Sequence, residues 1–240
     1  MEVQRFLSRL RRCIDDYNLI SEGDKIAVGL SGGKDSAALL LGLGELRRFY
    51  PKNYELFAIT ADLGFEGMDF KKLKNFCADI NVPYKIIKTD IKELVFDVRE
   101  EKNPCSLCSK MRKGALNDAI KEEGIKKLAL GHHFDDAIET CVMSLFLEGR
   151  FHCFKPLTYM SRADTYQIRP MLYVRENELE SLVEKMKLPI IKSNCPVDRY
   201  SKREEIKKTI AELEKTYPDI RQKIFTAIKG LPLEGWEKSE

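Results

Sequence analysis

The sequence lacks long apolar runs: no eighteen consecutive apolar residues occur among its 240 residues. A membrane-spanning helix needs about 20 predominantly apolar residues. The amino-terminal stretch is amphipathic and differs from a secretory signal. We therefore expect a cytoplasmic protein with no membrane partner. Net charge is also small, because 41 basic side chains face 38 acidic ones and leave +3. That total is too low to indicate a polyanionic partner by itself.

Cysteines and histidines at the spacings typical of disulfide frameworks or zinc sites are also scarce. The seven cysteines are odd in number and scattered, which in a reducing compartment indicates thiols or metal ligands and not disulfides. Cys13 and Cys77 fall on predicted helices and are interpreted as packing residues. None of the three histidines stands at zinc-finger spacing, and there is a single Cys-x-x-Cys pair. A four-ligand structural zinc site therefore lacks partners.

Residues 27–38, AVGLSGGKDSAA, have the pattern of a buried strand that turns into a helix through two glycines. Gly32 and Gly33 let backbone N–H groups approach an anion, and the next helix presents its positive dipole end to the same point. Lys34 adds a full positive charge. The Walker motif is excluded, because Val28 and Asp35 stand where it needs Gly and Ser or Thr. The pattern predicts a phosphate-binding loop, with a plain turn as the alternative.

Strand-like and helix-like segments alternate along the chain. This alternation predicts an α/β fold, a doubly wound five-stranded parallel sheet with right-handed crossovers. The predicted strands are 25–30, 54–61, 83–88, 127–130 and 166–170; the predicted helices are 3–17, 37–46, 69–80, 109–124, 137–147, 175–186, 202–215 and 219–228. Residues 148–164 lack a clear period and are expected to form a long surface loop.

We predict three parts: an amino-terminal basic helix (1–22), a nucleotide-binding domain that includes the metal site (23–200), and carboxyl-terminal helices packed on that domain (201–240). The first part carries four arginines, and the tail is rich in basic residues. They could contact RNA backbone or form solvated faces. The residues concerned are Arg5, Arg9, Arg11, Arg12, Lys202, Arg203, Lys207 and Lys208.

Polar residues follow the predicted strands where a doubly wound sheet binds ligands, beyond the carboxyl ends of its strands. Asp62 follows the second strand, and Gly131, His132 and His133 follow the fourth. We expect them beside a nucleotide. Asp135 and Asp136 come next; carboxylates there suit helix capping and Mg²⁺ binding alike. Asp136 is the candidate for a contact with substrate or metal.

Cys105 and Cys108 form the Cys-x-x-Cys pair, which can bring two thiolates to one metal. A redox couple and half of a zinc site are equally open readings of the pair alone. Cys195 precedes a proline in a polar turn, which is an unusual place for a packing cysteine.

Taken together, the segments SGGKDS, PCSLCSKMRKG, LALGHHFDD, IRPMLYVRE and IIKSNC resemble the tRNA 2-thiocytidine synthetase (TtcA) family of PP-loop ATP pyrophosphatases. The resemblance runs from Asp24 to about Ile228; residues 148–164 depart from the family's usual sequence. It implies an adenine nucleotide alpha hydrolase-like fold that uses ATP and Mg²⁺. It also implies a [4Fe-4S] cluster on Cys105, Cys108 and Cys195, with Cys153 outside the set.

The resemblance further implies an iron-sulfur-dependent tRNA thiolation, in which ATP adenylates a pyrimidine C2 oxygen before sulfur is inserted. The implied partners are tRNA and a sulfur donor such as a cysteine desulfurase, and the chain could form a homodimer. Two rival readings are an adenylating enzyme of lysidine or amide type with zinc on its cysteines, and an ATP-binding redox sensor. The implied catalytic residues are Lys34, Asp35, Arg112 and Asp136; the implied ATP-binding residues are Leu30, Ser31, Gly32, Gly33, Lys34, Asp35, Ser36, Asp62, Gly131 and His132.

Overall fold

The computed structural model describes residues 2–99, 104–191, 194–195 and 202–230. Contacts divide the chain into two units. The first comprises Met1–His133 and Lys155–Asp198, and the second comprises Phe134–Phe154 and Arg199–Glu240. The amino-terminal helix thus belongs to the first unit, whereas the carboxyl-terminal helices group with residues 134–154. The predicted boundary between residues 200 and 201 lies outside the described residues.

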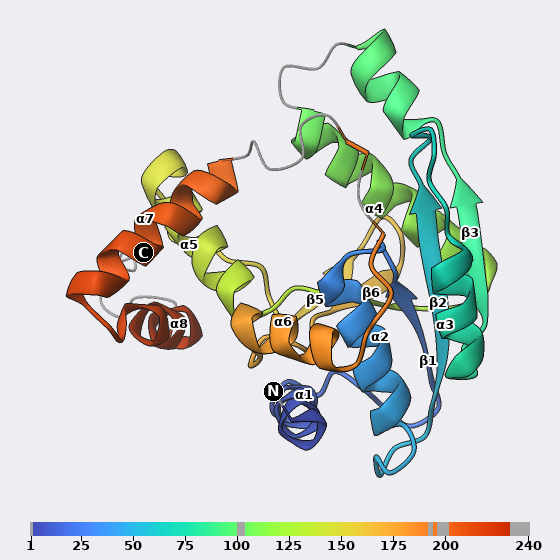
Figure 1. Cartoon of the computed structure of the whole chain (residues 1–240), viewed down its shortest axis with the longest axis horizontal. Coiled ribbons are helices and arrows are strands. Elements are labelled where there is room, and N and C mark those ends of the chain that lie inside the picture. Colours follow the sequence, from blue (N-terminus) through green and yellow to red (C-terminus); the bar gives the residue numbers. More distant parts are fainter. Residues whose placement is uncertain (1, 100–103, 192–193, 196–201, 231–240) are drawn as a thin grey trace, which may run out of the picture. The chain divides into compact units, whose positions relative to one another are not determined.

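A six-stranded sheet forms the centre of the first unit, in the order β3-β2-β1-β4-β6-β5 (Figure 1). All neighbouring strands pair in parallel except β5, which runs antiparallel to β6 at the edge. The strands are β1 (Asp24–Gly29), β2 (Tyr54–Asp62), β3 (Tyr84–Lys88), β4 (Lys127–Ala129), β5 (Leu157–Met160) and β6 (Thr165–Ile168). The order turns back at β1, and the adjacent carboxyl ends of β1 and β4 therefore form a switch point of the kind that binds ligands.

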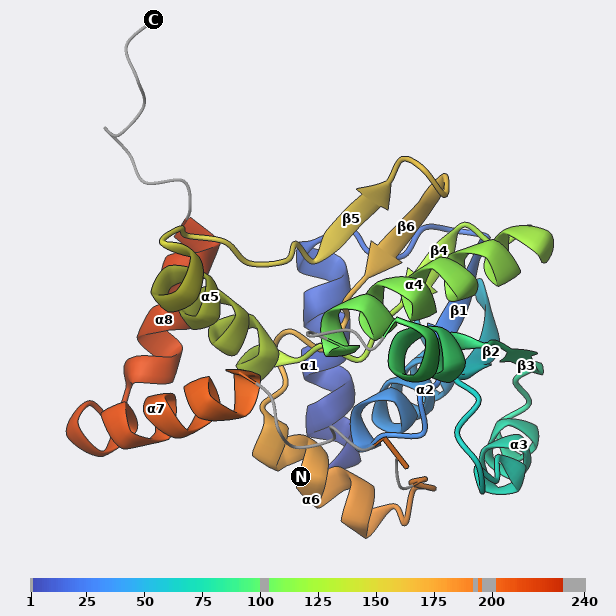
Figure 2. The same ribbon diagram turned by 90° about the horizontal axis from the view of Figure 1, so that it is seen from above.

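Helices cover both faces of this sheet (Figure 2). On one face, Leu116 and Ile120 of α4 pack against Ala27, Ile59 and Leu128. Helix α2, with α1 beside it, packs on β1 and β2. The helices of this unit are α1 (Val3–Asp16), α2 (Lys34–Leu46), α3 (Lys71–Asp79), the π-helix η1 (Glu93–Val98), α4 (Pro104–Glu122) and α6 (Glu176–Lys185).

The amphipathic pattern of α1 explains its position. Phe6, Leu10 and Ile14 are fully buried, because their helical spacing places them on one face. Gly42 of α2 allows the close approach: a Cβ there would come within 2.6 Å of the Phe6 ring and 2.8 Å of Leu10. Among the described residues, no helix is both long enough and apolar enough to cross a bilayer.

The predicted α/β fold with five parallel strands is confirmed, although the sheet has a sixth, antiparallel strand, and two details differ. First, the loop prediction over 148–164 is wrong at Leu157–Met160, which form β5. An edge strand of four half-exposed residues leaves almost no apolar alternation to detect. Second, α4 begins at Pro104, so Cys105 and Cys108 lie inside the helix and not ahead of it.

The second unit consists of α5 (Phe134–Glu148), α7 (Lys202–Thr216) and α8 (Ile220–Gly230). Its apolar contacts include the rings of Phe134 and Phe225, whose centroids lie 4.6 Å apart. Ile206 and Ile210 of α7 are also buried. Both carboxyl-terminal helices pack on α5.

Candidate functional site

The glycine-rich turn links β1 to α2. Leu30 still donates its N–H to the Ile59 carbonyl at 2.8 Å, after which the chain leaves the sheet. Gly32 has φ +86°, a left-handed conformation that glycine adopts without strain. Ser36 braces the turn, since its hydroxyl donates to the Gly33 carbonyl at 2.9 Å and accepts the Ser31 N–H at 3.1 Å. The sequence therefore produces a rigid loop closed by its own hydroxyl groups.

The amino terminus of α2 opens from this loop. Gly33 is its N-cap and supplies no side-chain acceptor to the first turn. The first N–H groups of a helix have no acceptor within the helix, so an anion can take that role. A Cβ on Gly33 would meet only the Ser31 hydroxyl, at 3.5 Å, so the surface above the loop is open. These features fit the phosphates of a nucleotide.

Three charged side chains meet at the start of α2. The Lys34 ammonium lies 3.0 Å from Oε1 of Glu176 and 3.4 Å from Oδ1 of Asp35. Burial lowers the pKa of Lys34, but the two carboxylates outweigh burial, so this pKa lies above its usual value. The predicted Lys34 and Asp35 are thus brought together. Sequence reasoning missed Glu176, whose one local signal is an acid at the start of a helix after IRPMLYVR.

The loop after β4 lies against the start of α2. A Cβ on Gly131 would lie 3.1 Å from the Asp35 carbonyl carbon and 3.2 Å from the Ser36 nitrogen. Nε2 of His133, which is buried, lies 3.9 Å from Oδ1 of Asp35. His132 is half-buried in the same loop. Glycine at residue 131 therefore allows the close approach of two backbones, and the place of Gly131 and His132 beside a nucleotide stays a prediction.

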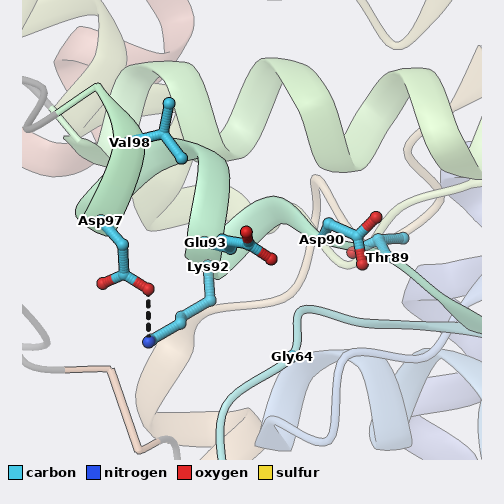
Figure 3. A pocket seen from close by; sticks show the side chains of 7 residues that line it. All are labelled: Gly64, Thr89, Asp90, Lys92, Glu93, Asp97 and Val98. Atoms are coloured by element: carbon cyan, nitrogen blue, oxygen red, sulfur yellow. Dashed lines mark hydrogen bonds and ion pairs between the residues drawn. The ribbon is translucent and has the colours of Figure 1, made fainter.

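Asp62 has a structural part in the loop after β2. Its carboxylate accepts the Gly64 N–H at 3.1 Å, and its carbonyl accepts the Thr89 hydroxyl at 2.8 Å. Gly64 and Thr89 line a pocket of about 400 Å³ whose other walls come from residues 90–98 (Figure 3). Three carboxylates line it, and its one lysine is paired with Asp97 at 2.6 Å. Such a lining disfavours phosphate. The prediction that Asp62 lies beside the nucleotide stays a prediction.

Cys105 and Cys108 lie in the first turns of α4, three residues apart and thus on one face. Cys105 is exposed, while Cys108 and Cys195 are half-buried. The pKa of Cys108 is raised, first by burial and then by the nearby Cys195 and Cys105, whereas the Arg112 guanidinium lowers it. The three predicted cysteines and Arg112 therefore share one electrostatic neighbourhood.

The segment that carries Cys195 rests on the phosphate loop. The Ile191 N–H donates to the Gly32 carbonyl at 2.9 Å. Asn194 donates its side-chain amide to the Glu66 carbonyl at 2.7 Å, in the loop after β2. The third cysteine is consequently held by the two loops that follow β1 and β2. Nothing in the local sequence signals these contacts, because they join distant parts of the chain.

The donor set is compatible with an iron-sulfur cluster, whose irons are held by cysteine thiolates. In the part of the chain that the structure describes, no three His, Cys, Asp or Glu side chains gather at the spacing of one metal ion. Cys105, Cys108 and Cys195 are the thiols that could hold such a cluster, and the Arg112 guanidinium acts on Cys108 among them.

Comparison with known proteins identifies the family. The family model described as a PP-loop domain matches residues 3–214. The tRNA-cytidine(32) 2-sulfurtransferase of Pelobacter propionicus is 34% identical over 231 residues, which are 95% of this chain and 86% of that protein. The chain belongs to this PP-loop sulfurtransferase family. A second member, from Shewanella sp. strain ANA-3, is 35% identical over 99% of this chain and 79% of its own length.

Solved structures agree with the PP-loop assignment. The U34-tRNA thiolase NcsA from Methanococcus maripaludis, solved with its [4Fe-4S] cluster, has a TM-score of 0.79 and 29% identity, and the match covers 98% of this chain and 82% of that one. The NH3-dependent NAD synthetase from Campylobacter jejuni, at 18% identity and a TM-score of 0.52, shares the fold alone.

The other four cysteines of this PP-loop protein are buried or hydrogen-bonded to other parts of the chain. Cys13 and Cys77 are buried, as the packing interpretation predicts. Cys141 is buried within α5, and burial raises the pKa of its thiol. Cys153 donates its thiol to the Ala137 carbonyl at 3.4 Å.

In the second unit, the paired acids after β4 bind arginines. Oδ1 of Asp136 lies 3.2 Å from Arg203, which also binds Glu139 at 3.2 Å. Oδ1 of Asp135 lies 2.9 Å from Arg221. These contacts hold α7 and α8 on α5. A catalytic part for Asp136 stays a prediction, and its carboxylate is bound to Arg203 in this structure.

Many of the basic side chains that could contact RNA form ion pairs with acidic residues of the same unit. Arg9 and Arg5 both face Glu178. The other pairs are Arg11 with Asp15, Arg12 with Asp16, and Lys202 with Glu205. A paired arginine leaves less charge for a phosphate backbone, so these pairs favour the solvated-face reading for α1. The RNA reading of the tail stays a prediction.

Proposed function

We propose that this protein is an ATP-dependent tRNA 2-sulfurtransferase that acts on a cytidine of the anticodon loop. The cytidine C2 oxygen attacks the α-phosphorus of ATP, and pyrophosphate leaves. A hydrosulfide ion then attacks C2 and displaces AMP, so the C2 oxygen departs with AMP. Sulfur delivered as a persulfide would first need two electrons from a thiol reductant, which releases it as hydrosulfide. The names of the relatives support the substrate, and the thiolase from Methanococcus supports the cluster.

One observation carries the proposal: the cysteine group and the phosphate loop are neighbours. Ile191, four residues before Cys195, is hydrogen-bonded to Gly32 of the loop. Adenylation takes place on the C2 oxygen and sulfur insertion on C2 itself, so the groups that perform the two steps must lie close together. Cysteines with a purely structural zinc would have no reason to share a segment with the ATP site.

The chain's own residues account for the first step. The amino terminus of α2 and Lys34 bind the β and γ phosphates and stabilise the charge that develops on pyrophosphate as it leaves. Mg²⁺ would neutralise part of the same charge, and Asp35, in the first turn of α2, is a carboxylate that could hold it. Gly131 lets the loop after β4 close on this site.

Cys105, Cys108 and Cys195 would hold the [4Fe-4S] cluster, which supplies an open iron that can bind sulfur. Arg112, beside Cys108, favours an anionic sulfur species there. We infer that a cysteine desulfurase or a similar donor provides the sulfur, that the protein works in the cytoplasm, and that it could act as a homodimer.

Access to the base favours a single-stranded target. The C2 oxygen of a stacked and paired cytidine is shielded, and extrusion from a stack costs least in a loop. An anticodon-loop cytidine meets this requirement.

The test uses anaerobically prepared protein, ATP and unmodified tRNA. Lys34→Ala should abolish pyrophosphate release and 2-thiocytidine formation, measured by nucleoside mass spectrometry, because the charge on the leaving group loses its partner. Lys72→Ala, an exposed lysine in the first turn of α3, is the matched control. Normal turnover by Lys34→Ala would contradict the assignment. Lysidine formation or colourless protein would favour the zinc enzyme, and absence of pyrophosphate release by the wild type would favour the sensor.

A further inference from the structure

The contact between Lys34 and Glu176 joins the phosphate loop to α6. Lys34 is the first residue of α2, and Glu176 is the first residue of α6. The two helices pack together within the first unit (Figure 1). The side chains are largely covered, with exposed fractions of 26% for Lys34 and 19% for Glu176. The pair is therefore partly shielded from the solvent screening that weakens surface ion pairs.

One ammonium lies between two carboxylates. Lys34 faces Glu176 at 3.0 Å and Asp35 at 3.4 Å. The next acid of α6, Glu178, faces Arg5 and Arg9 and so brings its own counter-charge. Nε2 of His133 lies 3.9 Å from Oδ1 of Asp35. Taken by themselves, the three side chains of Lys34, Asp35 and Glu176 carry one more negative than positive charge.

A phosphate group that enters the loop must compete for this ammonium. Lys34 is the lysine of the loop, and the Glu176 carboxylate binds it at 3.0 Å. Like charges repel strongly where water is excluded. A carboxylate beside the loop therefore opposes phosphate binding until it moves or is screened by a cation.

Glu176 can give up Lys34 without losing all stabilisation. It occupies the first turn of α6, where the helix dipole favours a negative charge. Asp35 remains on the same helix as Lys34, so the ammonium keeps one carboxylate when Glu176 is displaced.

We propose that Glu176 is a positioning residue of the phosphate loop, which holds the Lys34 ammonium in place of phosphate before nucleotide binds and yields it when phosphate arrives. The inference rests on the proposed function only in that the loop binds phosphate. The proposal predicts the direction in which one substitution changes the affinity for phosphate. Removing the charge of Glu176 should strengthen phosphate binding, whereas a purely structural brace would weaken it when disturbed.

The experiment measures binding of inorganic pyrophosphate to the full chain by calorimetry, without Mg²⁺ and at fixed ionic strength. Glu176→Gln keeps an oxygen that can accept from Lys34 but removes the charge. It should bind pyrophosphate roughly tenfold more tightly than the wild type, equivalent to about 1.4 kcal/mol. Glu180→Gln, an exposed acid on the same helix, is the matched control and should stay within about twofold.

Turnover gives a second readout. In pyrophosphate release with tRNA, Glu176→Gln should lower both KM for ATP and kcat, because the product pyrophosphate leaves more slowly. Glu176→Asp, which retains the charge, should return both towards wild-type values. Melting curves confirm that each variant is folded. Should Glu176→Gln not fold, Glu176→Asp and Glu176→Ala are compared in the same titration, with tighter binding expected for the alanine variant alone.

Unchanged or weaker pyrophosphate binding by the folded charge-free variant overturns the proposal and leaves Glu176 as a brace. If neither wild type nor variant binds pyrophosphate, the proposal and the phosphate loop fall together. If pyrophosphate binding behaves as expected but no thiolated tRNA forms, the proposed function fails while this inference stands.

Discussion

Arg203 offers a direct test of whether the acids after β4 serve stability or catalysis. Its guanidinium donates to Asp136 and Glu139, both at 3.2 Å, and to the Thr140 hydroxyl at 3.2 Å. Glu139 is almost fully covered, with 5% of its side chain exposed. Arg203→Met keeps much of the apolar stem but removes every donor, so a buried carboxylate loses its main counter-charge.

The expected cost follows from burial. Breaking a buried ion pair costs roughly 3–5 kcal/mol, and the cost falls with exposure. Because 37% of the Arg203 side chain is exposed and Lys207 also acts on Glu139, we expect a cost below that range, about 2 kcal/mol. Glu139→Met combined with Arg203→Met removes both partners and should recover at least half of the loss, about 1 kcal/mol.

The loss should also depend on pH. Burial raises the pKa of Glu139, against the opposing effect of Arg203. A carboxyl whose pKa is higher in the folded than in the unfolded state costs stability when it is ionised, and the cost fades as the pH falls through the folded pKa. Arg203→Met removes the lowering partner, so its deficit should be largest at neutral pH and smaller at about pH 5.

Urea unfolding followed by circular dichroism, together with hydrogen exchange of α7, measures these changes. Lys202→Met is the control, because it removes the same charge one residue earlier at a side chain that is 67% exposed. A fully stable Arg203→Met variant that loses only tRNA affinity would refute the reasoning and return Arg203 to the RNA-contacting group.

Two further predictions concern the cluster and the tRNA. Cys105→Ala and Cys195→Ala should each lose most of the iron after anaerobic reconstitution, whereas Cys153→Ser should keep it, because its thiol is bonded to Ala137; iron loss in the Cys153 variant would add a fourth ligand. The logarithm of tRNA affinity should fall linearly with the logarithm of salt concentration, by close to one unit of slope per phosphate contact. A slope near zero in filter binding would remove backbone contacts from the interaction.

The parallel sheet could be predicted because each buried strand has a local signal. Tyr54–Asp62 and Lys127–Ala129 are bordered by polar turns, and their parallel pairing follows from the intervening helices. β5 could not be predicted in the same way, since its four residues are stabilised by pairing with β6 and not by their own pattern. Whether a short edge strand forms depends on its pairing with the neighbouring strand.

For the site too, features with a local sequence signal could be predicted, whereas contacts between distant residues could not. The glycine pair signals the phosphate loop, because adjacent glycines permit backbone conformations such as the left-handed φ that Gly32 adopts. The ion pair of Lys34 and Glu176 joins residues 142 positions apart, and the pair of Arg203 and Asp136 joins residues 67 apart. Neither has a local signature. The basic neighbourhood of Arg203 in the sequence suggests RNA contact or a solvated face, and only the structure shows its ion pairs with Asp136 and Glu139 of α5.

The narrow gap at Gly131 has a consequence for how such a protein can evolve. A side chain at this position would place its Cβ 3.1 Å from the Asp35 carbonyl carbon, so the start of α2 would have to shift by a few tenths of an ångström. The two nearest atoms belong to the backbone, so a change of rotamer alone does not relieve the contact. A substitution of Gly131 is therefore coupled to the phosphate loop, and we expect a compensating change in that loop to accompany it.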